Sequence, residues 1–233
     1  MIPVYLKTDS GAADDPIYYV VAANGTFLVR RTTLFTATTR ASEIIGLESH
    51  DEQISLRFQK VPRVAMEQIL GFFTWVYRRW DGEAIVFLYY HPDRGEFRVD
   101  VPRQTLPRFR SGQRWHTAGR VEYGSVERPD GFVKLGDAHS HADSPAFFSK
   151  TDDRDDEEDG LRIVVGRLDE PSVEVCASFV VNGCRFSLAP DEVVEIPSDP
   201  FSPAPPPEEW MRRVVCRHET PPKHSDRWRG CGH

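Results

Sequence analysis

The sequence predicts an α/β (α+β) protein with a mixed central sheet flanked by helices and a β-rich extension in front of it. Three observations support this fold class. Residues 64–80 carry apolar side chains at helical spacing. Residues 83–90 and 97–102 are typical of two strands joined by a Pro-Asp-Arg-Gly turn. Further strand patterns follow at 161–188, so helical and strand segments belong to one region.

Residues 1–60 form the predicted extension. Two β-type runs, 17–23 and 26–32, are joined by Asn-Gly, a strong hairpin signal. Residues 54–58 (ISLRF) alternate apolar and polar side chains, as a half-buried strand does. This region is either a recognition module or a β extension that completes the sheet.

Residues 64–80 predict a helix that packs on the sheet. The positions that carry this pattern are Val64, Ile69, Phe72, Phe73, Val76 and Tyr77. Pro62, just before them, fits the start of a helix.

Residues 83–90 (EAIVFLYY) predict a buried strand, and 97–102 (FRVDVP) alternate as its hairpin partner. Residues 103–131 are rich in Arg, Gly and Pro and lack periodicity, which predicts a long loop. Loops of that length in a compact domain are often functional. Further strands are expected at 132–138, 161–166, 173–179 and 185–188.

The composition changes near residue 197. The run PSDPFSPAPPPEEW is typical of extended or polyproline-like chain, with a short helix possible at 210–215 and a mobile end. We therefore expect three parts: a β-rich extension at 1–60, an α/β domain at 61–197 and a Pro-rich flexible tail at 198–233.

Composition excludes several classes of protein. The chain has 233 residues and a formal charge of -7, and 39% of its residues are hydrophobic. Its longest apolar run is far below the roughly 20 residues that cross a bilayer, and MIPVYLKTDSGAADD lacks the pattern of a secretion signal. We expect a cytoplasmic protein without a membrane partner. The acidic balance argues against nucleic acid.

The most informative segment is HSHADSPAFFSKTD, residues 139–152. His139 and His141 are two residues apart, so on a strand they project to the same face. Asp152, brought back by the following turn, can complete a set of three ligands. Three such ligands leave one position open on a tetrahedral zinc, which is typical of a catalytic site. Water bound there becomes a nucleophile at neutral pH.

This pattern, H-S-H-x7-S-x2-D, resembles the JAB/MPN (JAMM) metalloprotease family, whose members remove ubiquitin or ubiquitin-like proteins. The resemblance covers roughly residues 62–196 and implies a JAB/MPN-like, cytidine-deaminase-like sheet. It implies one catalytic Zn²⁺ ion on His139, His141 and Asp152. It also implies that the Ser149 hydroxyl stabilises the oxyanion of the tetrahedral intermediate.

The family also needs a glutamate as general base, on a strand upstream of the histidines. Glu67 lies in the helical pattern, and Glu96 lies in the second strand of the predicted hairpin. Glu83 opens the first strand and directly follows the helix, which is the order that the family has. We favour Glu83, and the alternative is a solvated carboxylate at a strand end.

The phrases AFFSKTDDRDDE and LRIVVGRLDEPSVEV resemble the prokaryotic branch, including proteins of PRTRC-type gene clusters and of bacterial ubiquitin-like conjugation systems. The implied function is removal of a ubiquitin-like modifier or trimming of its precursor. Implied partners are the modifier, its conjugates, and E1-like and E2-like proteins. The residues expected to hold the modifier's tail are Arg108, Arg110, Arg114 and Trp115.

Two other functions stay open. One is a zinc hydrolase that acts on a small molecule or on a sulfur-carrier adduct. The other is a non-catalytic scaffold of a conjugation system. Metal content and the effect of Glu83→Gln separate the three.

Two further features allow either a structural or a functional interpretation. The run 152–159 holds seven acids in eight residues, and it is either a solvated loop or a feature that favours a cationic substrate tail. Cys216-x-His218 and Cys231-x-His233 form a repeated Cys/His pattern that could bind a second, structural zinc. Their spacing does not match the usual finger patterns.

Overall fold

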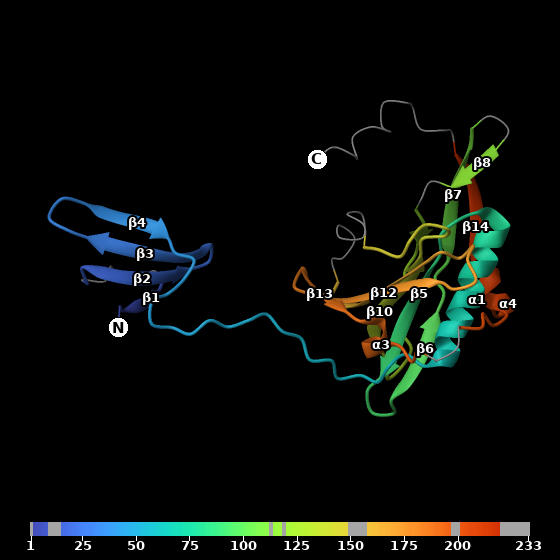
Figure 1. Ribbon diagram of the computed structural model, residues 1–233, viewed down its shortest axis with the longest axis horizontal. Helices are drawn as coiled ribbons and strands as arrows, with labels where there is room; N and C mark the ends of the chain where they lie inside the picture. Colours follow the sequence, from blue (N-terminus) through green and yellow to red (C-terminus); the bar gives the residue numbers. More distant parts are fainter. Residues whose placement is uncertain are drawn as a thin grey trace. The chain divides into compact units, whose positions relative to one another are not determined.

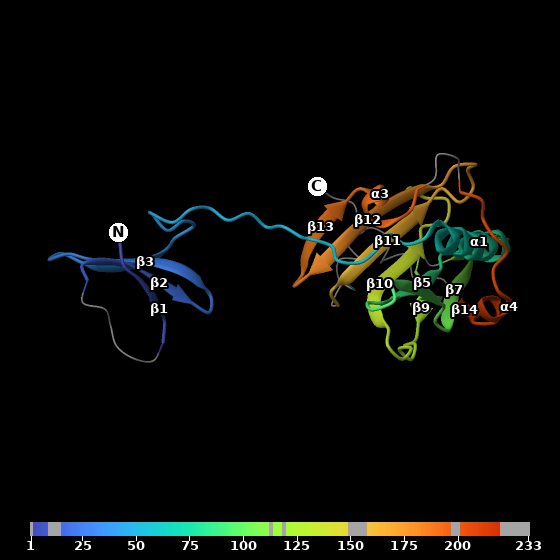
Figure 2. The ribbon, with the colours of Figure 1, turned by 90° about the horizontal axis from the view of Figure 1, so that it is seen from below.

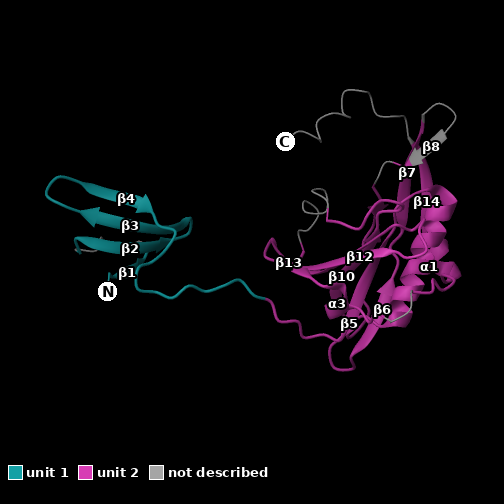
Figure 3. Cartoon of the chain, viewed as in Figure 1, with its two compact units in different colours: residues 1–53 teal, residues 54–233 magenta. Residues whose placement is uncertain are grey.

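The computed structural model describes residues 2–8, 15–111, 114–117, 120–148, 158–196 and 201–219. The chain divides into two compact units, Met1–Gln53 and Ile54–His233 (Figure 3).

Unit 1 is a four-stranded sheet with the strand order β1-β2-β3-β4 (Figure 1). Its strands are β1 (Val4–Leu6), β2 (Ile17–Ala22), β3 (Gly25–Arg31) and β4 (Thr36–Arg40). β1 runs parallel to β2, and the other neighbours are antiparallel. The predicted hairpin is confirmed, with its turn one residue earlier than the expected Asn24-Gly25, since Gly25 already belongs to β3. Because Ala22 pairs with Gly25, its loop consists of the two residues between them.

The strand predicted at 54–58 is wrong, since this segment pairs with no strand in the described part of the chain. Leu56 and Phe58 instead pack against the core of unit 2. The Phe58 ring lies 6.3 Å from the Tyr90 ring and 6.2 Å from the Phe179 ring, centroid to centroid. The alternation in the sequence therefore reflects side-chain burial without backbone pairing.

Unit 2 is built on a six-stranded mixed sheet with the order β13-β12-β11-β10-β5-β6 (Figure 1). The strands are β5 (Ile85–His91), β6 (Glu96–Asp100), β10 (Val133–Ser140), β11 (Gly160–Gly166), β12 (Glu174–Val181) and β13 (Cys184–Leu188). β10 and β11 run parallel, and the other neighbours run antiparallel. The expected mixed α/β architecture is confirmed.

Helix α1 (Arg63–Trp80) covers one face of this sheet (Figure 2). It begins after Pro62 and ends at Asp81, whose left-handed backbone (φ 54°) lets its N–H donate to the Tyr77 carbonyl at 2.7 Å. Its fully buried side chains are Met66, Ile69, Leu70, Phe72, Phe73 and Val76. Burial of each apolar side chain contributes about 1.5–3 kcal/mol. A smaller cluster of Ile85, Phe87 and Tyr89 lies on the other face of β5.

The long loop predicted at 103–131 is wrong for 14 of its 29 residues, which lie in strands. It contains β7 (Gln104–Ser111), β8 (Arg114–Thr117) and β9 (Glu122–Tyr123). These strands form a second sheet in which β7 pairs with β8, β9 and β14 (Val214–Glu219). Because β14 comes from much later in the chain, the apolar periodicity of residues 103–131 does not predict this sheet.

The tail predicted as flexible from residue 198 also differs, because residues 201–219 pack on the rest of unit 2. The Ala204 N–H donates to the Glu67 carbonyl of α1 at 2.9 Å. Helix α4 (Glu208–Met211) begins two residues before the short helix that the sequence predicts. It buries Trp210 against Phe72, with 5.8 Å between the two ring centroids. A further turn of helix, α3 (Pro190–Val193), was not predicted. The Pro-rich segment is thus held on α1 by a backbone hydrogen bond.

Among the described residues, no helix has the length and apolar character that crossing a membrane requires.

The C-terminal segment crosses α1 at Gly71. Because of this close crossing, we expect Gly71→Ala to change the stability in the direction opposite to that of an ordinary glycine-to-alanine substitution in a helix. A Cβ at this position would lie 1.6 Å from the Ala204 oxygen. Replacing a helix-interior glycine by alanine ordinarily stabilises a helix by about 0.5–1 kcal/mol. Here we expect Gly71→Ala to lower the free energy of unfolding by about 1–3 kcal/mol, because backbone must move apart.

Urea unfolding measures this change. Val64→Ala, at a position of α1 that is 66% exposed, is the control and should change stability by no more than about 0.5 kcal/mol. A Gly71→Ala protein more stable than the wild type would contradict the close crossing.

Candidate active site

Strand β10 positions the two histidines. Ala138 points into the core beside α1, so Asp137 and His139 project from the opposite face of the sheet. His141 follows directly, and its N–H donates to the Val165 carbonyl of β11 at 2.8 Å. The two imidazole ring centroids are 5.2 Å apart. Residues two apart on a strand are separated by about 6.7 Å along it, so the rings lean toward each other.

The start of β5 brings Glu83 to the same place. Ile85 is the register partner of His139, and the Ser140 N–H donates to the Ala84 carbonyl at 2.9 Å. One further step of the same register puts Glu83 opposite His141 and on the same face. Facing residues of an antiparallel pair have Cβ atoms about 4.5–5.5 Å apart. The structure therefore brings together Glu83, His139 and His141.

The other two glutamates considered from the sequence lie elsewhere. Glu67, on α1, accepts from the Arg63 Nε at 2.9 Å and from the Ser202 N–H at 3.1 Å, so it has a structural role. Glu96, on β6, forms a surface ion pair with Arg94 at 3.2 Å.

Ser140 is a structural residue of the site that sequence reasoning missed. It is fully buried, and its Oγ accepts a hydrogen bond from the Ala84 N–H at 3.0 Å. A serine between two histidines gives no signal of this role in the sequence, because its partner is 56 residues earlier. The bond ties the backbone next to Glu83 to the backbone between the histidines.

The chain turns sharply after His141. Ala142 has left-handed backbone (φ 51°), and the Ser144 N–H donates to the His141 carbonyl at 2.9 Å. The turn crosses Gly166 at the end of β11, where a Cβ would lie 2.4 Å from the Ser144 oxygen. The chain then brings the Phe147 ring edge-on to His141, at 4.7 Å between centroids. One side of His141 is thus packed by an aromatic ring.

Ser149 and Asp152 lie outside the described residues, so the oxyanion role and the third ligand stay predictions. Within the described ranges, no three His, Cys, Asp or Glu side chains are grouped so that they could hold a metal by themselves. The two histidines nevertheless fit zinc. Imidazole is a ligand that zinc prefers, and two imidazoles on one tetrahedral zinc have ring centroids roughly 5 Å apart, close to the observed separation.

The proposed second metal pattern is only partly described. Cys216 and His218 lie on β14, whereas Cys231 and His233 fall outside the described residues. Burial raises the pKa of the Cys216 thiol, and Arg108 beside it partly offsets that effect. Zinc binds the thiolate, so the environment of Cys216 does not favour a ligand.

The residues expected to hold a substrate tail lie on the β7–β8 hairpin, where Arg110 pairs with Trp115. Arg110 is exposed, and Arg108 is half-buried next to Cys216. For Arg114 and Trp115 the structure describes the strand and not the side chains.

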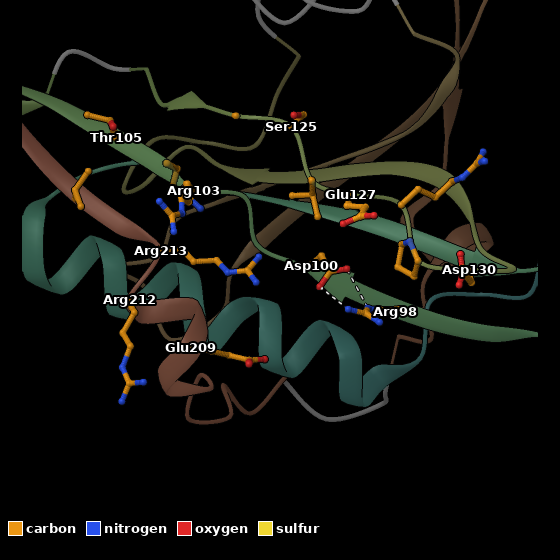
Figure 4. Close-up of a pocket in the computed structure, with 16 residues that line it drawn as sticks. Arg98, Asp100, Arg103, Thr105, Ser125, Glu127, Asp130, Glu209, Arg212 and Arg213 are labelled. Carbon is orange, nitrogen blue, oxygen red and sulfur yellow. Dashed lines mark hydrogen bonds and ion pairs between the residues drawn. The ribbon is translucent and has the colours of Figure 1, made fainter.

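A groove that the sequence did not predict lies beside these strands (Figure 4). Its volume is about 1260 Å³. Its charged lining residues are Arg98, Asp100, Arg103, Glu127, Arg128, Asp130, Glu209, Arg212 and Arg213. The walls come from the β6–β7 connection, residues 124–130 and the α4–β14 segment, which are too far apart in sequence for a motif to reveal them.

The groove is linked to the histidines through Gln104, a buried residue on its wall. The Gln104 side-chain amide bonds both backbone groups of Ile85, accepting from the N–H at 3.1 Å and donating to the carbonyl at 3.0 Å. Ile85 in turn faces His139 on β10. The groove therefore adjoins β5, which begins two residues after Glu83.

Comparison with known proteins shows that this region is similar to one family. Residues 70–184 match the family of prokaryotic homologs of the JAB domain. This range includes the whole of β5 and β10 with Glu83, His139 and His141, so the part of the chain that carries the candidate site is similar to prokaryotic JAB domains. The resemblance drawn from the histidine motif is confirmed at this level.

Two other comparisons add little. Nothing among curated proteins matches the chain. One solved structure that it matches is the solution structure of protein DSY2949 from Desulfitobacterium hafniense, at 16% identity and a TM-score of 0.32. That match covers 66% of this chain and 90% of the other. A likeness at that TM-score carries no argument.

Removing the Ser140 hydroxyl should weaken the site's backbone. In Ser140→Ala, the buried Ala84 N–H loses its acceptor, which costs about 1–3 kcal/mol in the free energy of unfolding. Denaturant unfolding measures the loss. Ser187→Ala, at an exposed position of β13, is the matched control and should stay within about 0.5 kcal/mol of the wild type. Equal stability of the two variants would contradict the role given to Ser140.

Proposed function

We propose that unit 2 is a zinc-dependent isopeptidase or peptidase that removes a ubiquitin-like modifier from its targets or trims the modifier's precursor. The observation that carries this proposal is the convergence of Glu83, His139 and His141 on one face of the sheet in a region similar to prokaryotic JAB domains. The cytidine-deaminase-like form of the fold, the zinc ion and a cytoplasmic location belong to the same proposal.

His139 and His141 would hold the metal, with Asp152 as the third ligand. When bound there, zinc supplies Lewis-acid chemistry: it lowers the pKa of water and polarises a carbonyl oxygen. His141 is largely buried and packed by Phe147, so its ring has little freedom to turn away.

Glu83 is the proposed general base and acid. Its carboxylate accepts a proton from the attacking water as the water oxygen adds to the carbonyl carbon of the scissile bond. It then donates that proton to the leaving nitrogen as the C–N bond breaks, which yields a carboxylate on the modifier and a free amine on the target. Ser149 donates a hydrogen bond to the carbonyl oxygen while charge develops on it.

The groove supports a polypeptide substrate over a small molecule. Small-molecule sites usually occupy about 300–1000 Å³ and are mostly apolar, whereas this groove is larger and lined by charges of both signs. We assign it to the modifier or its conjugate, with Arg108, Arg110, Arg114 and Trp115 as further candidates for the modifier's tail. E1-like and E2-like proteins would be the other partners of such a system.

Cleavage of a fusion tests the proposal. The substrate is a ubiquitin-like protein of the same organism with a C-terminal extension, and zinc content is measured on each enzyme. We expect cleavage by the wild type and a loss of about 10²–10⁴-fold in Glu83→Gln, which removes the proton acceptor. Both proteins should hold one zinc ion.

Glu96→Gln is the matched control, because this carboxylate is exposed on β6, and it should cut at the wild-type rate. His139→Ala should lose zinc and activity together. Zinc binding with hydrolysis of a sulfur-carrier adduct alone would favour the small-molecule enzyme. Wild-type cleavage by Glu83→Gln would refute Glu83 as the base.

A further inference from the structure

Two charged side chains, Arg162 and Asp137, lie in a row that ends at His139. Asp137 precedes His139 by two residues on β10, so both side chains lie on the same face. On the adjacent strand β11, Arg162 is the register partner of Asp137. Figure 2 shows these two strands side by side.

The two oxygens of Asp137 face different partners. Oδ2 lies 3.3 Å from Nε of Arg162, and Oδ1 lies 3.7 Å from Nδ1 of His139. The second distance is a close electrostatic contact that is longer than a hydrogen bond. The Asp137 carboxylate thus lies between the Arg162 guanidinium and Nδ1 of His139.

Arg162 is held firmly in this position. It is 7% exposed, and its Nη2 donates to the Glu158 carbonyl at 2.6 Å. Gly160 leaves the necessary room, since a Cβ there would lie 2.9 Å from Nη1 of Arg162. A buried guanidinium needs a carboxylate partner, and the parallel register of β10 and β11 supplies Asp137.

A carboxylate beside one imidazole nitrogen favours the tautomer in which that nitrogen carries the proton and the other nitrogen does not. When Nδ1 carries the proton and faces a carboxylate, Nε2 is left with its lone pair, which is the form that binds a metal. Histidine ligands of metals are commonly oriented in this way by a carboxylate behind them, and loss of that carboxylate typically weakens metal binding 10–100-fold.

We propose that Asp137, anchored by Arg162, is a positioning residue that sets the tautomer and ring orientation of His139 for zinc. This inference rests on the proposed function in that it takes His139 as a zinc ligand. It adds two residues that the histidine motif does not contain. The competing interpretation is an ion pair that merely joins β10 to β11.

Zinc affinity separates these interpretations. The dissociation constant for zinc is measured by competition with a chromophoric chelator on the full chain. Asp137→Asn keeps the shape of the side chain and should bind zinc 10–100-fold more weakly. Asp137→Glu, which keeps the carboxylate, should recover part of that loss.

A matched control removes a different ion pair near the same two strands. Lys134, on β10, pairs with Glu158, just before β11. Lys134→Gln should leave the zinc dissociation constant unchanged. Long-range ¹H–¹⁵N spectra of the zinc-free proteins report which nitrogen of His139 is protonated, and Asp137→Asn should reduce the Nδ1–H form while Lys134→Gln should not.

The outcomes distinguish the inference from the function on which it rests. If the wild type binds no zinc, the proposed function fails and the inference fails with it. If the wild type binds zinc and Asp137→Asn binds it equally well, the inference alone is overturned. A lower melting temperature of Asp137→Asn with an unchanged zinc dissociation constant would mean a structural ion pair only.

Discussion

The pairing of β10 with its two neighbours is the contact on which the rest of the site depends. Antiparallel pairing with β5 sets Ile85 opposite His139, and the two-residue period of a strand then puts Glu83, His139 and His141 on one face. A slip of one residue in β10 would turn both histidines toward α1 and leave Glu83 behind on the other face. The parallel pairing with β11 has a separate effect, because parallel neighbours need a long crossover. That crossover, residues 141–159, carries the second half of the sequence motif.

The sheet divides its two faces between stability and chemistry. The face under α1 is closed by fully buried aromatic and aliphatic side chains and contributes most of the apolar burial of unit 2. Among the described residues, the other face holds a small apolar cluster around Phe87, and the polar side chains of Asp137 and Arg162 are paired there with little exposure to solvent. Substitutions on this second face can therefore change the site without opening the core.

Local patterns in the sequence predicted what local contacts determine. Helix α1 and the β5–β6 hairpin follow from apolar periodicity and from a short turn, and Glu83 could be chosen because it stands between them. The second sheet was missed because β7 needs β14, and residues 54–58 were misread because their burial involves no strand. Ser140, Asp137 and the groove escaped for the same reason: each acquires its role from a partner distant in sequence.

The pairing of β7 with β14 also constrains how unit 2 folds. β7 ends at Ser111, whereas β14 begins at Val214, so this contact closes a loop of nearly half the chain. Contacts of such long range form late and slow folding. During synthesis, the edge of β7 has to wait until the ribosome has released residue 219, while its hairpin with β8 can already form. A stop or a truncation before β14 would leave an open strand edge, which is a template for aggregation.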